Sequence, residues 1–351
     1  MRCPVCQTRL QADATQCDCG ALVKVIPAAV APPLIKGGRR IEFLGDGATL
    51  FGMHLLYLAM TAVTVGIYHF WAKVKVRQYV YSMTRFEGDR FAYHGQGQEL
   101  LIGWLKVAGI FGITLGLGLF LQFGLKISEG ELIGKLVAGV VAFVLLPVAL
   151  AGAQRYRLSR TSWRGVRFSF RGATREFWGR WVGWSLLTTV TAGLAYPFFM
   201  NEVRRFMVDN SWFGNRKFSY TGDGKDLFGP FILMAVLFVP TFGLAWFGYK
   251  ARRERYYWEH THFEEATFAC TVTGSGLFSL WITNMVLLSV TLWFARPWAQ
   301  VRSMHYLTSN LQLVGPLDVD RVEQEIQQAG AAGEGLTEFV ETGFFDVELG
   351  L

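Results

Sequence analysis

Six apolar segments, each about 20 residues long, constrain this chain more than any other feature of its sequence. Each segment contains at most one Asp, Glu, Lys or Arg. An α-helix needs about 20 such residues to cross about 30 Å of hydrocarbon. One segment could be a buried core helix, but six could not. The segments are residues 50–70, 101–122, 132–153, 181–200, 229–249 and 279–298.

The composition agrees with a membrane protein. Charged residues make up only 17% of the chain, against about 25% in an ordinary soluble domain. Tryptophans lie at or near the ends of the segments, where amphipathic rings favour the headgroup region. These are Trp71, Trp104, Trp178, Trp181, Trp281 and Trp298. Residues 1–40 contain no apolar run of signal-peptide length, so the first span is expected to direct insertion itself.

A repeat of about 50 residues runs through the apolar region. Four copies of a Thr-x-Gly step end at Gly66, Gly116, Gly193 and Gly243, and a degenerate fifth ends at Trp293. The steps are 50, 77, 50 and 50 residues apart, and the additional 27 residues are the segment 132–153. Such a fixed period indicates a protein built from repeated supersecondary units.

Each unit continues with basic residues and then with alternating aromatic and small polar residues that end at glycine. Examples are residues 91–95, 168–172 and 218–222, and this alternation predicts a short β-hairpin. We therefore predict an all-α polytopic membrane protein built from ~50-residue repeats, each with a helix, a basic collar and a short β-hairpin. The repeat-built domain is expected at residues 48–315.

Two stretches resemble a known family. Residues 64–79 (TVGIYHFWAKVKVRQY) and 91–100 (FAYHGQGQEL) are similar to the YjgN-like bacterial inner-membrane proteins, a domain of unknown function. The resemblance covers roughly residues 41–315. It implies a multi-pass protein of the bacterial inner membrane and implies no activity.

The topology has two solutions. If each apolar segment crosses once, successive units are inverted, as in many transporters. If the Thr-x-Gly steps are breaks, the helices are re-entrant and every basic collar faces the cytosol. Interrupted helices in lipid must be buried by neighbours, so we favour single crossings.

Four cysteines near the N-terminus have the spacing of a metal site. Cys3, Cys6, Cys17 and Cys19 could supply the four thiolates of tetrahedral zinc, although a Cys-x-Cys pair stands where zinc ribbons normally carry Cys-x-x-Cys. We predict a zinc-ribbon-like module at residues 1–24 with structural zinc, in the cytosol because its thiols are reduced. A linker follows at 25–47, and an acidic flexible tail is expected at 316–351.

Basic residues follow the apolar segments. Nucleic-acid binding is not expected, since Lys and Arg at helix ends more often meet anionic headgroups. Inside the segments, His54 and Asn284 are polar residues expected to bond to neighbouring helices. The predicted lipid-headgroup or anchoring residues are Lys73, Lys75, Arg77, Arg155, Arg157, Arg204, Arg205, Arg252 and Arg253.

No enzyme signature is present, with no P-loop, no Gly-x-Ser-x-Gly elbow and no HExxH motif. We therefore expect no enzyme and no catalytic residues. The expected function is membrane transport or lipid handling, with the bilayer and its anionic lipids as partners. The alternative is a membrane-anchored scaffold or sensor that recruits a cytosolic protein partner through the zinc module and the tail.

Overall fold

The computed structural model describes residues 38–124, 130–317 and 322. The predicted zinc module and most of the acidic tail lie outside these residues. The helices are α1 (Gly47–Val63), α2 (His69–Met83), α3 (Gly97–Leu119), α4 (Gly130–Arg160), α5 (Thr174–Val190), α6 (Tyr196–Asp209), α7 (Gly224–Phe238), α8 (Ala245–Glu259), α9 (Gly274–Val290) and α10 (Arg296–Ser309). The strands are β1 (Gly38–Phe43), β2 (Thr84–Phe86), β3 (Asp89–Tyr93), β4 (Thr161–Trp163), β5 (Val166–Phe170), β6 (Ser211–Phe213), β7 (Arg216–Tyr220), β8 (Thr261–Phe263), β9 (Ala266–Cys270) and β10 (Leu311–Val314).

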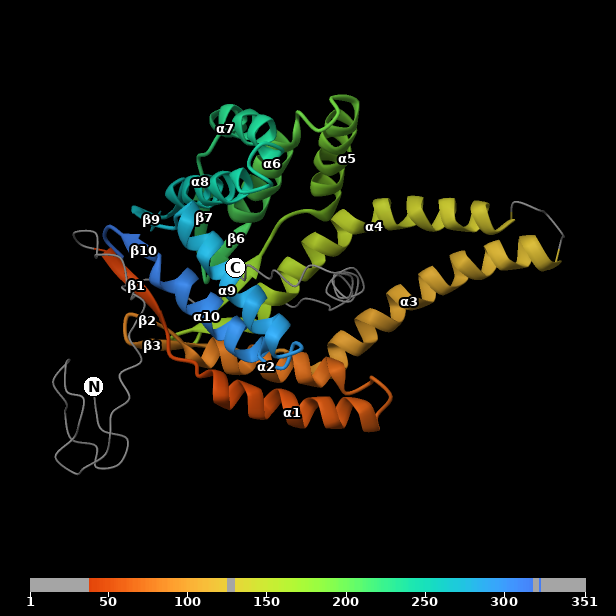
Figure 1. The fold of residues 1–351 in the computed structure, drawn as a ribbon, viewed down its shortest axis with the longest axis horizontal. Coiled ribbons are helices and arrows are strands. Elements are labelled where there is room, and N and C mark those ends of the chain that lie inside the picture. Colours follow the sequence, from red (N-terminus) through yellow and green to blue (C-terminus); the bar gives the residue numbers. More distant parts are fainter. Residues whose placement is uncertain (1–37, 125–129, 318–321, 323–351) are drawn as a thin grey trace. The chain divides into compact units, whose positions relative to one another are not determined.

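The strands of all the repeats form one closed antiparallel barrel. Its order is β1-β10-β9-β8-β7-β6-β5-β4-β3-β2, and β2 pairs again with β1. Strand β1 is the first strand of the described chain and β10 is the last. The two strands pair antiparallel, with Gly38 opposite Val314. Closure removes the unpaired strand edges that would otherwise attract other chains. The barrel lies at one end of the helices in Figure 1.

Apolar side chains fill the barrel, two from each repeat. Phe86, Trp163, Phe213, Phe263 and Leu313 are buried there and stand 77, 50, 50 and 50 residues apart. A second set with the same repeat spacing packs against them and consists of Ile41, Phe91, Phe168, Phe218 and Phe268. Neighbouring rings touch around the barrel, with 4.7 Å between the centroids of Phe168 and Phe213. The barrel is therefore a packed core.

The helices leave the barrel in antiparallel pairs. We call α1, α3, α5, α7 and α9 the outgoing helices and α2, α4, α6, α8 and α10 the return helices. In the first unit, β1 leads into α1, and α2 leads back into β2, whose Thr84 pairs with Phe43 at the end of β1. Because both strands belong to one barrel, the chain must return to the barrel side within each unit.

Three of the Thr-x-Gly steps, which end at Gly66, Gly193 and Gly243, are the turns at the tips of their hairpins. Val65 and Gly66 have φ of 50° and 90°, and Phe242 and Gly243 have φ of 49° and 83°. This left-handed backbone conformation is the reason for glycine at the last position. The degenerate copy makes the same turn, and Trp293, which stands where the other copies have glycine, has φ of 70°.

The threonine of each step stabilises both helices that meet at the turn. The Thr241 hydroxyl donates to the Leu237 carbonyl at 2.6 Å and accepts from the Ala245 amide at 3.1 Å. Thr64, Thr191 and Thr291 make the corresponding pair of bonds. One hydroxyl thus satisfies the end of one helix and the otherwise unpaired amide of the next.

The second hairpin is longer than the others because its Thr-x-Gly step does not turn. Thr114 stays inside α3 and only donates to the Phe111 carbonyl. Helices α3 and α4 pack through glycines, so closely that a Cβ on Gly118 would come within 2.7 Å of the Gly134 Cα atom. Among the described residues, Gly97–Phe123 and Leu132–Arg160 are long and apolar enough to cross a membrane, and only 17% and 28% of their apolar windows are buried.

The predicted fold class is therefore wrong. The fold is not all-α, because the short hairpins pair with one another into a ten-stranded barrel instead of lying singly beside helices. The segments at 50–70, 181–200, 229–249 and 279–298 are also not single helices, because each contains a tip turn and the start of the return helix. Only the segments at 101–122 and 132–153 lie in long apolar helices.

Candidate functional site

In three of the five units a tyrosine of the return helix holds the loop before the outgoing helix. The Tyr79 hydroxyl accepts from the Asp46 amide at 2.9 Å and donates to the Asp46 carbonyl at 3.2 Å. Tyr256 repeats the pattern on Asp223, at 2.7 and 3.0 Å. Tyr306 donates to the Thr273 carbonyl at 3.5 Å. The bases of these three hairpins are thus fixed by hydrogen bonds within the unit.

The preceding residue of the return helix reaches the loop of the next unit. Arg155 donates to the Gly172 carbonyl at 2.6 Å, and Arg205 donates to the Gly222 carbonyl at 2.7 Å. His305 Nε2 lies 3.3 Å from the Gly45 carbonyl, which links the last unit to the first. These contacts join neighbouring hairpins into a ring around the barrel axis.

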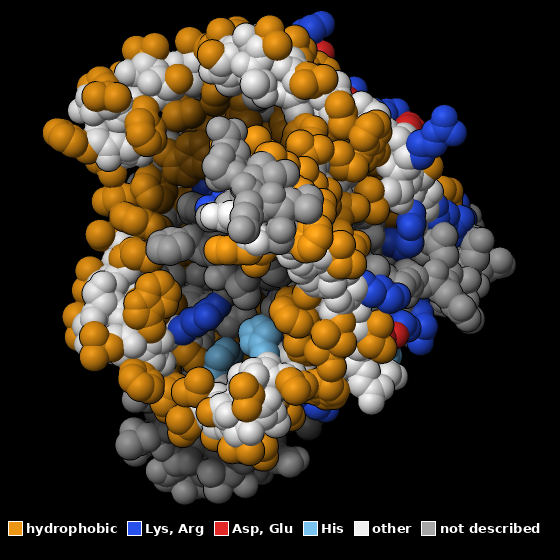
Figure 2. Space-filling model, turned by 90° about the vertical axis from the view of Figure 1, so that its right-hand side faces the viewer, with side chains coloured by type: hydrophobic (Ala, Val, Ile, Leu, Met, Phe, Trp, Pro, Cys, Tyr) orange, Lys and Arg blue, Asp and Glu red, His pale blue; other side chains and the backbone are white. Residues whose placement is uncertain are grey.

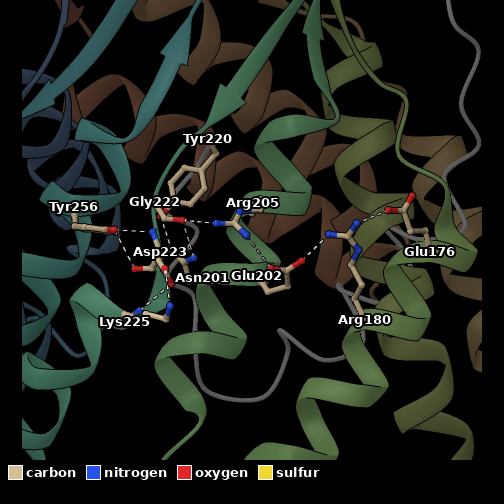
Figure 3. A network of polar contacts seen from close by, with 10 residues as sticks. All are labelled: Glu176, Arg180, Asn201, Glu202, Arg205, Tyr220, Gly222, Asp223, Lys225 and Tyr256. Atoms are coloured by element: carbon tan, nitrogen blue, oxygen red, sulfur yellow. Dashed lines mark hydrogen bonds and ion pairs between the residues drawn. The ribbon is translucent and has the colours of Figure 1, made fainter.

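Figure 3 shows one of these junctions, where Arg205 is part of a wider polar network. Glu202 pairs with Arg205 at 3.5 Å and with Arg180 of α5 at 2.6 Å. The Tyr220 hydroxyl donates to Asn201 at 2.7 Å, and burial raises the pKa of Tyr220, so it remains a donor. Each polar side chain named here has a hydrogen-bond or ion-pair partner in the protein, so we interpret this network as structural.

The return helices bury one side against the next outgoing helix. Ala251 packs in a cluster with Leu277 of α9, and Val301 packs with Leu50 of α1. Arg252 and Arg302, the next residues along the chain, are exposed. Arg302 donates to the Thr283 hydroxyl of α9, the outgoing helix of its own unit, at 2.9 Å. We count from the buried residue of each return helix, such as Ala251 or Val301. The residues one position before it, three after it and six after it lie on a third side of the helix, which faces away from the outgoing helix of the same unit.

This third side carries basic residues in four of the five return helices, α2, α4, α6 and α8. Figure 2 shows Lys, Arg and His side chains in a hollow surrounded by hydrophobic side chains. In α8 the positions are occupied by Lys250, Glu254 and Tyr257, with Arg253 between them. We call the following residues the inner basic face: Lys73, Arg77, Arg157, Arg204, Lys250 and Arg253.

The residues of the inner basic face are buried or half-buried, and those around Glu254 interact with one another. Arg77 is only 8% exposed. Arg253 donates to Glu254 at 3.0 Å, and their side chains are 12% and 17% exposed. Glu254 also interacts electrostatically with Arg204 of α6 and with Lys250. Burying several cations beside one carboxylate is costly, and this arrangement favours an anion as a further partner.

The remaining predicted site residues lie elsewhere. Lys75 and Arg252 are exposed, while Arg155 and Arg205 hold the loops described above. His54 Nδ1 lies 2.8 Å from the Leu50 carbonyl of its own helix. Asn284 of α9 bonds to Ser303 of α10 at 3.2 Å. The cysteines Cys3, Cys6, Cys17 and Cys19 lie outside the described residues.

Among the residues that the structure describes, no group of three His, Cys, Asp or Glu could hold a metal ion. The fifth cysteine, Cys270, ends strand β9, and burial raises the pKa of its thiol to about 11. A thiol in that state is a packing residue and a poor nucleophile at neutral pH.

The set of predicted lipid-contact residues omitted two members of this site, Lys250 and Glu254. A signal for both was present in the sequence. Counted back from the strand that follows each return helix, Lys73 and Lys250 occupy one repeat position, and Arg77, Arg204 and Glu254 occupy another. Their spacing of four residues places them on one helix side.

Comparisons with known proteins agree with the repeat region. The family model described as "Bacterial protein of unknown function (DUF898)" matches residues 39–248 and 230–339. "Inner membrane protein YjgN" of Salmonella typhimurium is 32% identical over 138 residues, which are 39% of this chain and 33% of the relative. The Escherichia coli K12 protein of the same name is 28% identical over 159 residues, 45% of this chain and 37% of the relative. The matches thus span about a third of these curated relatives' length. No solved structure matches the chain significantly.

Proposed function

The chain belongs to the DUF898 family of bacterial proteins, and from that premise we propose that it is an inner-membrane protein that holds an anionic phospholipid by its phosphate. The inner basic face is the observation that carries this proposal. The location is supported by the relatives named inner membrane proteins and by the two long apolar helices.

The hairpin tips support insertion into the bilayer. Val65, Val190 and Phe242 are 92%, 83% and 96% exposed, and each contributes roughly 1.5–3 kcal/mol when it leaves water. The turns at residues 64–68, 191–195, 239–244 and 291–295 contain no Asp, Glu, Lys or Arg. A tip without charge can enter hydrocarbon at little cost.

Helix length suggests how deep the hairpins reach. An outgoing helix of 17 residues, such as α1, is about 25 Å long, somewhat less than the hydrocarbon thickness. The shorter hairpins then dip into the bilayer and return, while α3 and α4 reach across it. The barrel and the basic residues stay together on one side, which the positive-inside rule assigns to the cytosol.

The inner basic face runs from Lys73 and Lys250, which lie about one turn from the tip ends of α2 and α8, to Arg157 near the barrel end of α4, and its long side chains can reach the depth of the headgroups in this arrangement. A lipid phosphate there would neutralise the buried cations, and acyl chains would lie along the apolar outgoing helices. Because aromatic side chains fill the barrel, a lipid that stays in the membrane is a better ligand than a solute passing along the barrel axis.

Native mass spectrometry of the full-length protein tests this proposal. The protein is offered equal amounts of phosphatidylglycerol and phosphatidylcholine, and we expect retention of phosphatidylglycerol. Changing Lys73 and Arg157 to Met should reduce this retention about tenfold, since a hydrogen bond to a charged group contributes about 1.5–3 kcal/mol. The matched change of the exposed Lys75 and Arg252 to Met should leave it unchanged. Equal retention of both lipids by the unaltered protein would reject the proposal.

A further inference from the structure

One sector of the inner basic face is more strongly built than the others. It consists of Arg204 on α6 and of Lys250, Arg253, Glu254 and Tyr257 on α8. Arg204 lies over the Trp258 ring, with its guanidinium carbon 4.7 Å from the ring centroid. Arg253 lies 5.7 Å from the centroid of the Tyr257 ring. Aromatic faces thus hold both guanidinium groups in place, and each group uses only part of its edge, since Arg204 donates to the Thr261 hydroxyl at 3.5 Å and Arg253 donates to Glu254 at 3.0 Å.

The charges of this sector do not balance. Arg204, Lys250 and Arg253 carry three positive charges, and among the residues that the structure describes Glu254 is the one carboxylate that interacts with all three. The Nε atoms of Arg204 and Arg253 are buried and have no hydrogen-bond partner in the described part of the chain. The Tyr257 hydroxyl is likewise buried without a described partner, in a residue that is only 7% exposed.

Three kinds of donor therefore converge on one place. Two guanidinium groups present planar forks that match oxygen anions in pairs, an ammonium adds a point charge, and a phenol adds a neutral donor. A tetrahedral anion with three or four acceptor oxygens satisfies this set better than a carboxylate with two.

The other return helices lack this combination. The corresponding positions of α10 are Gln300, Met304 and Leu307, which carry no charge. In α4 they are Leu150, Gln154 and Arg157, with one charge, and in α2 they are Lys73, Arg77 and Val80, with two charges and no phenol. The five units form a ring of similar hairpins, yet among the described return helices the pair α6 and α8 combines two guanidinium groups, an ammonium and a buried phenol at these neighbouring positions. A role in ring assembly alone would require the same residues in every unit.

We infer that Arg204, Lys250, Arg253 and Tyr257 form a phosphate-binding site between α6 and α8. This inference deepens the proposed function and rests on it for the lipid source of the phosphate. Glu254 holds Arg253 in position and limits affinity, because its charge opposes that of the ligand. The site takes a phosphate group, whether it belongs to a lipid headgroup or is free in solution.

The experiment uses the full-length protein and two probes. Phosphatidic acid retention is measured by native mass spectrometry, and inorganic phosphate binding is measured by isothermal titration calorimetry. Changing Arg204 and Lys250 to Met should weaken binding about tenfold or more, while the Arg253–Glu254 pair remains intact. Arg252→Met, which changes an exposed neighbour on the same helix, is the matched control. Far-UV circular dichroism and size-exclusion chromatography show whether each variant is folded.

Glu254→Gln supplies a test in the opposite direction. Removing the carboxylate should strengthen phosphate binding severalfold, a result that a misfolded variant could not give. Loss of phosphatidic acid retention in the Arg204/Lys250 variant supports a lipid site, and loss of inorganic phosphate binding supports a site for the free ion. Unchanged binding of both probes in that variant, or weaker binding in Glu254→Gln, overturns the inference. If the unaltered protein retains no anionic lipid but binds phosphate through these residues, the proposed function fails and the site stands.

Discussion

The two arms of a helix hairpin differ in chemistry although they are consecutive in sequence. The outgoing helices α1 and α9 contain no Asp, Glu, Lys or Arg, whereas the return helix α8 contains six such residues among fifteen. Exposed apolar residues dominate α1, and half-buried or buried residues dominate α8. The charges of the outgoing helices α5 and α7 lie in their first two turns, at the base of the hairpins. Beyond these turns the outgoing helices form an apolar outer layer, and the return helices form a more polar inner layer.

This difference explains why a membrane protein can keep so many cations in its helices. A charge on an outgoing helix would meet lipid chains directly and cost several kcal/mol. A charge on a return helix faces the interior of the ring, where other charges and aromatic rings surround it. The repeat thus separates two tasks, membrane contact and polar chemistry, between the arms of one hairpin.

The largest expected effect concerns the side of the membrane on which the hairpins begin. Single cysteines at Gln98, Arg175, Lys225 and Ser275 lie in the exposed first turns of α3, α5, α7 and α9. Since every hairpin returns to the barrel, all four should react alike with an impermeant maleimide, and all should be protected in intact cells if the barrel is cytosolic. The measurement is labelling before and after lysis.

The background for that labelling has Cys3, Cys6, Cys17 and Cys19 changed to Ser. Cys270 can remain, because its raised pKa and burial keep the thiol protonated at pH 7.5. Alternating behaviour, with Lys225 on the side opposite to Arg175 and Ser275, would restore single crossings and contradict the arrangement of the arms.

A smaller effect is expected where two arms pack directly on each other. Gly118→Leu should push α3 and α4 apart, because a Cβ there already meets the Gly134 backbone, and should destabilise the protein by about 1–3 kcal/mol. Gly116→Leu is the matched control, since its Cβ would meet nothing within 4 Å. Thermal unfolding in detergent measures both. Equal melting temperatures would show that the two long helices do not depend on this contact.

The smallest effect is expected at a tip turn. Thr241→Val removes the hydroxyl that caps α8 and should cost about 1 kcal/mol. Thr114→Val, within the continuous helix α3, removes only a bond to its own helix and should cost less. Chemical denaturation of the two variants gives the comparison. A greater loss at Thr114 would mean that the turns are set by the chain's packing and that the threonine caps contribute little.

Much of the repeat was predictable from the sequence. Its period, the positions of the Thr-x-Gly steps and the presence of short hairpins followed from spacing alone. The closed barrel did not follow, because a hairpin of three and five residues, such as β6 and β7, carries no information about which other hairpin it will pair with. The pairing of β1 with β10 joins residues more than 270 positions apart.

The main error of the prediction from sequence concerned the direction of the chain at the Thr-x-Gly steps. A run of 20 apolar residues predicts one crossing, but in residues 50–70 the turn at Val65 and Gly66 divides that run between two helices. The same step in Thr114 to Gly116 remains helical. The two cases share the Thr-x-Gly step, and α4, which follows the second, adds the partner against which α3 continues.

The basic residues show the same division. The sequence placed Lys and Arg after the apolar segments, but it could not separate Arg204, which faces the inner layer, from Arg205, which holds a neighbouring loop. These residues are adjacent, so a helix turns them apart by about 100°. Only the arrangement of the hairpins in a ring shows which side of the return helix faces the interior.

The sequence by itself therefore determined the repeat period, the apolar character of the outgoing arms and the basic character of the return arms, because spacing and composition are local properties. Tertiary structure decided the rest: that the hairpins close a barrel, that the chain turns back at each tip, and that one subset of arginines and lysines faces inward. Those outcomes depend on contacts between units 50 or more residues apart, and the energy of such contacts is absent from any single stretch of chain.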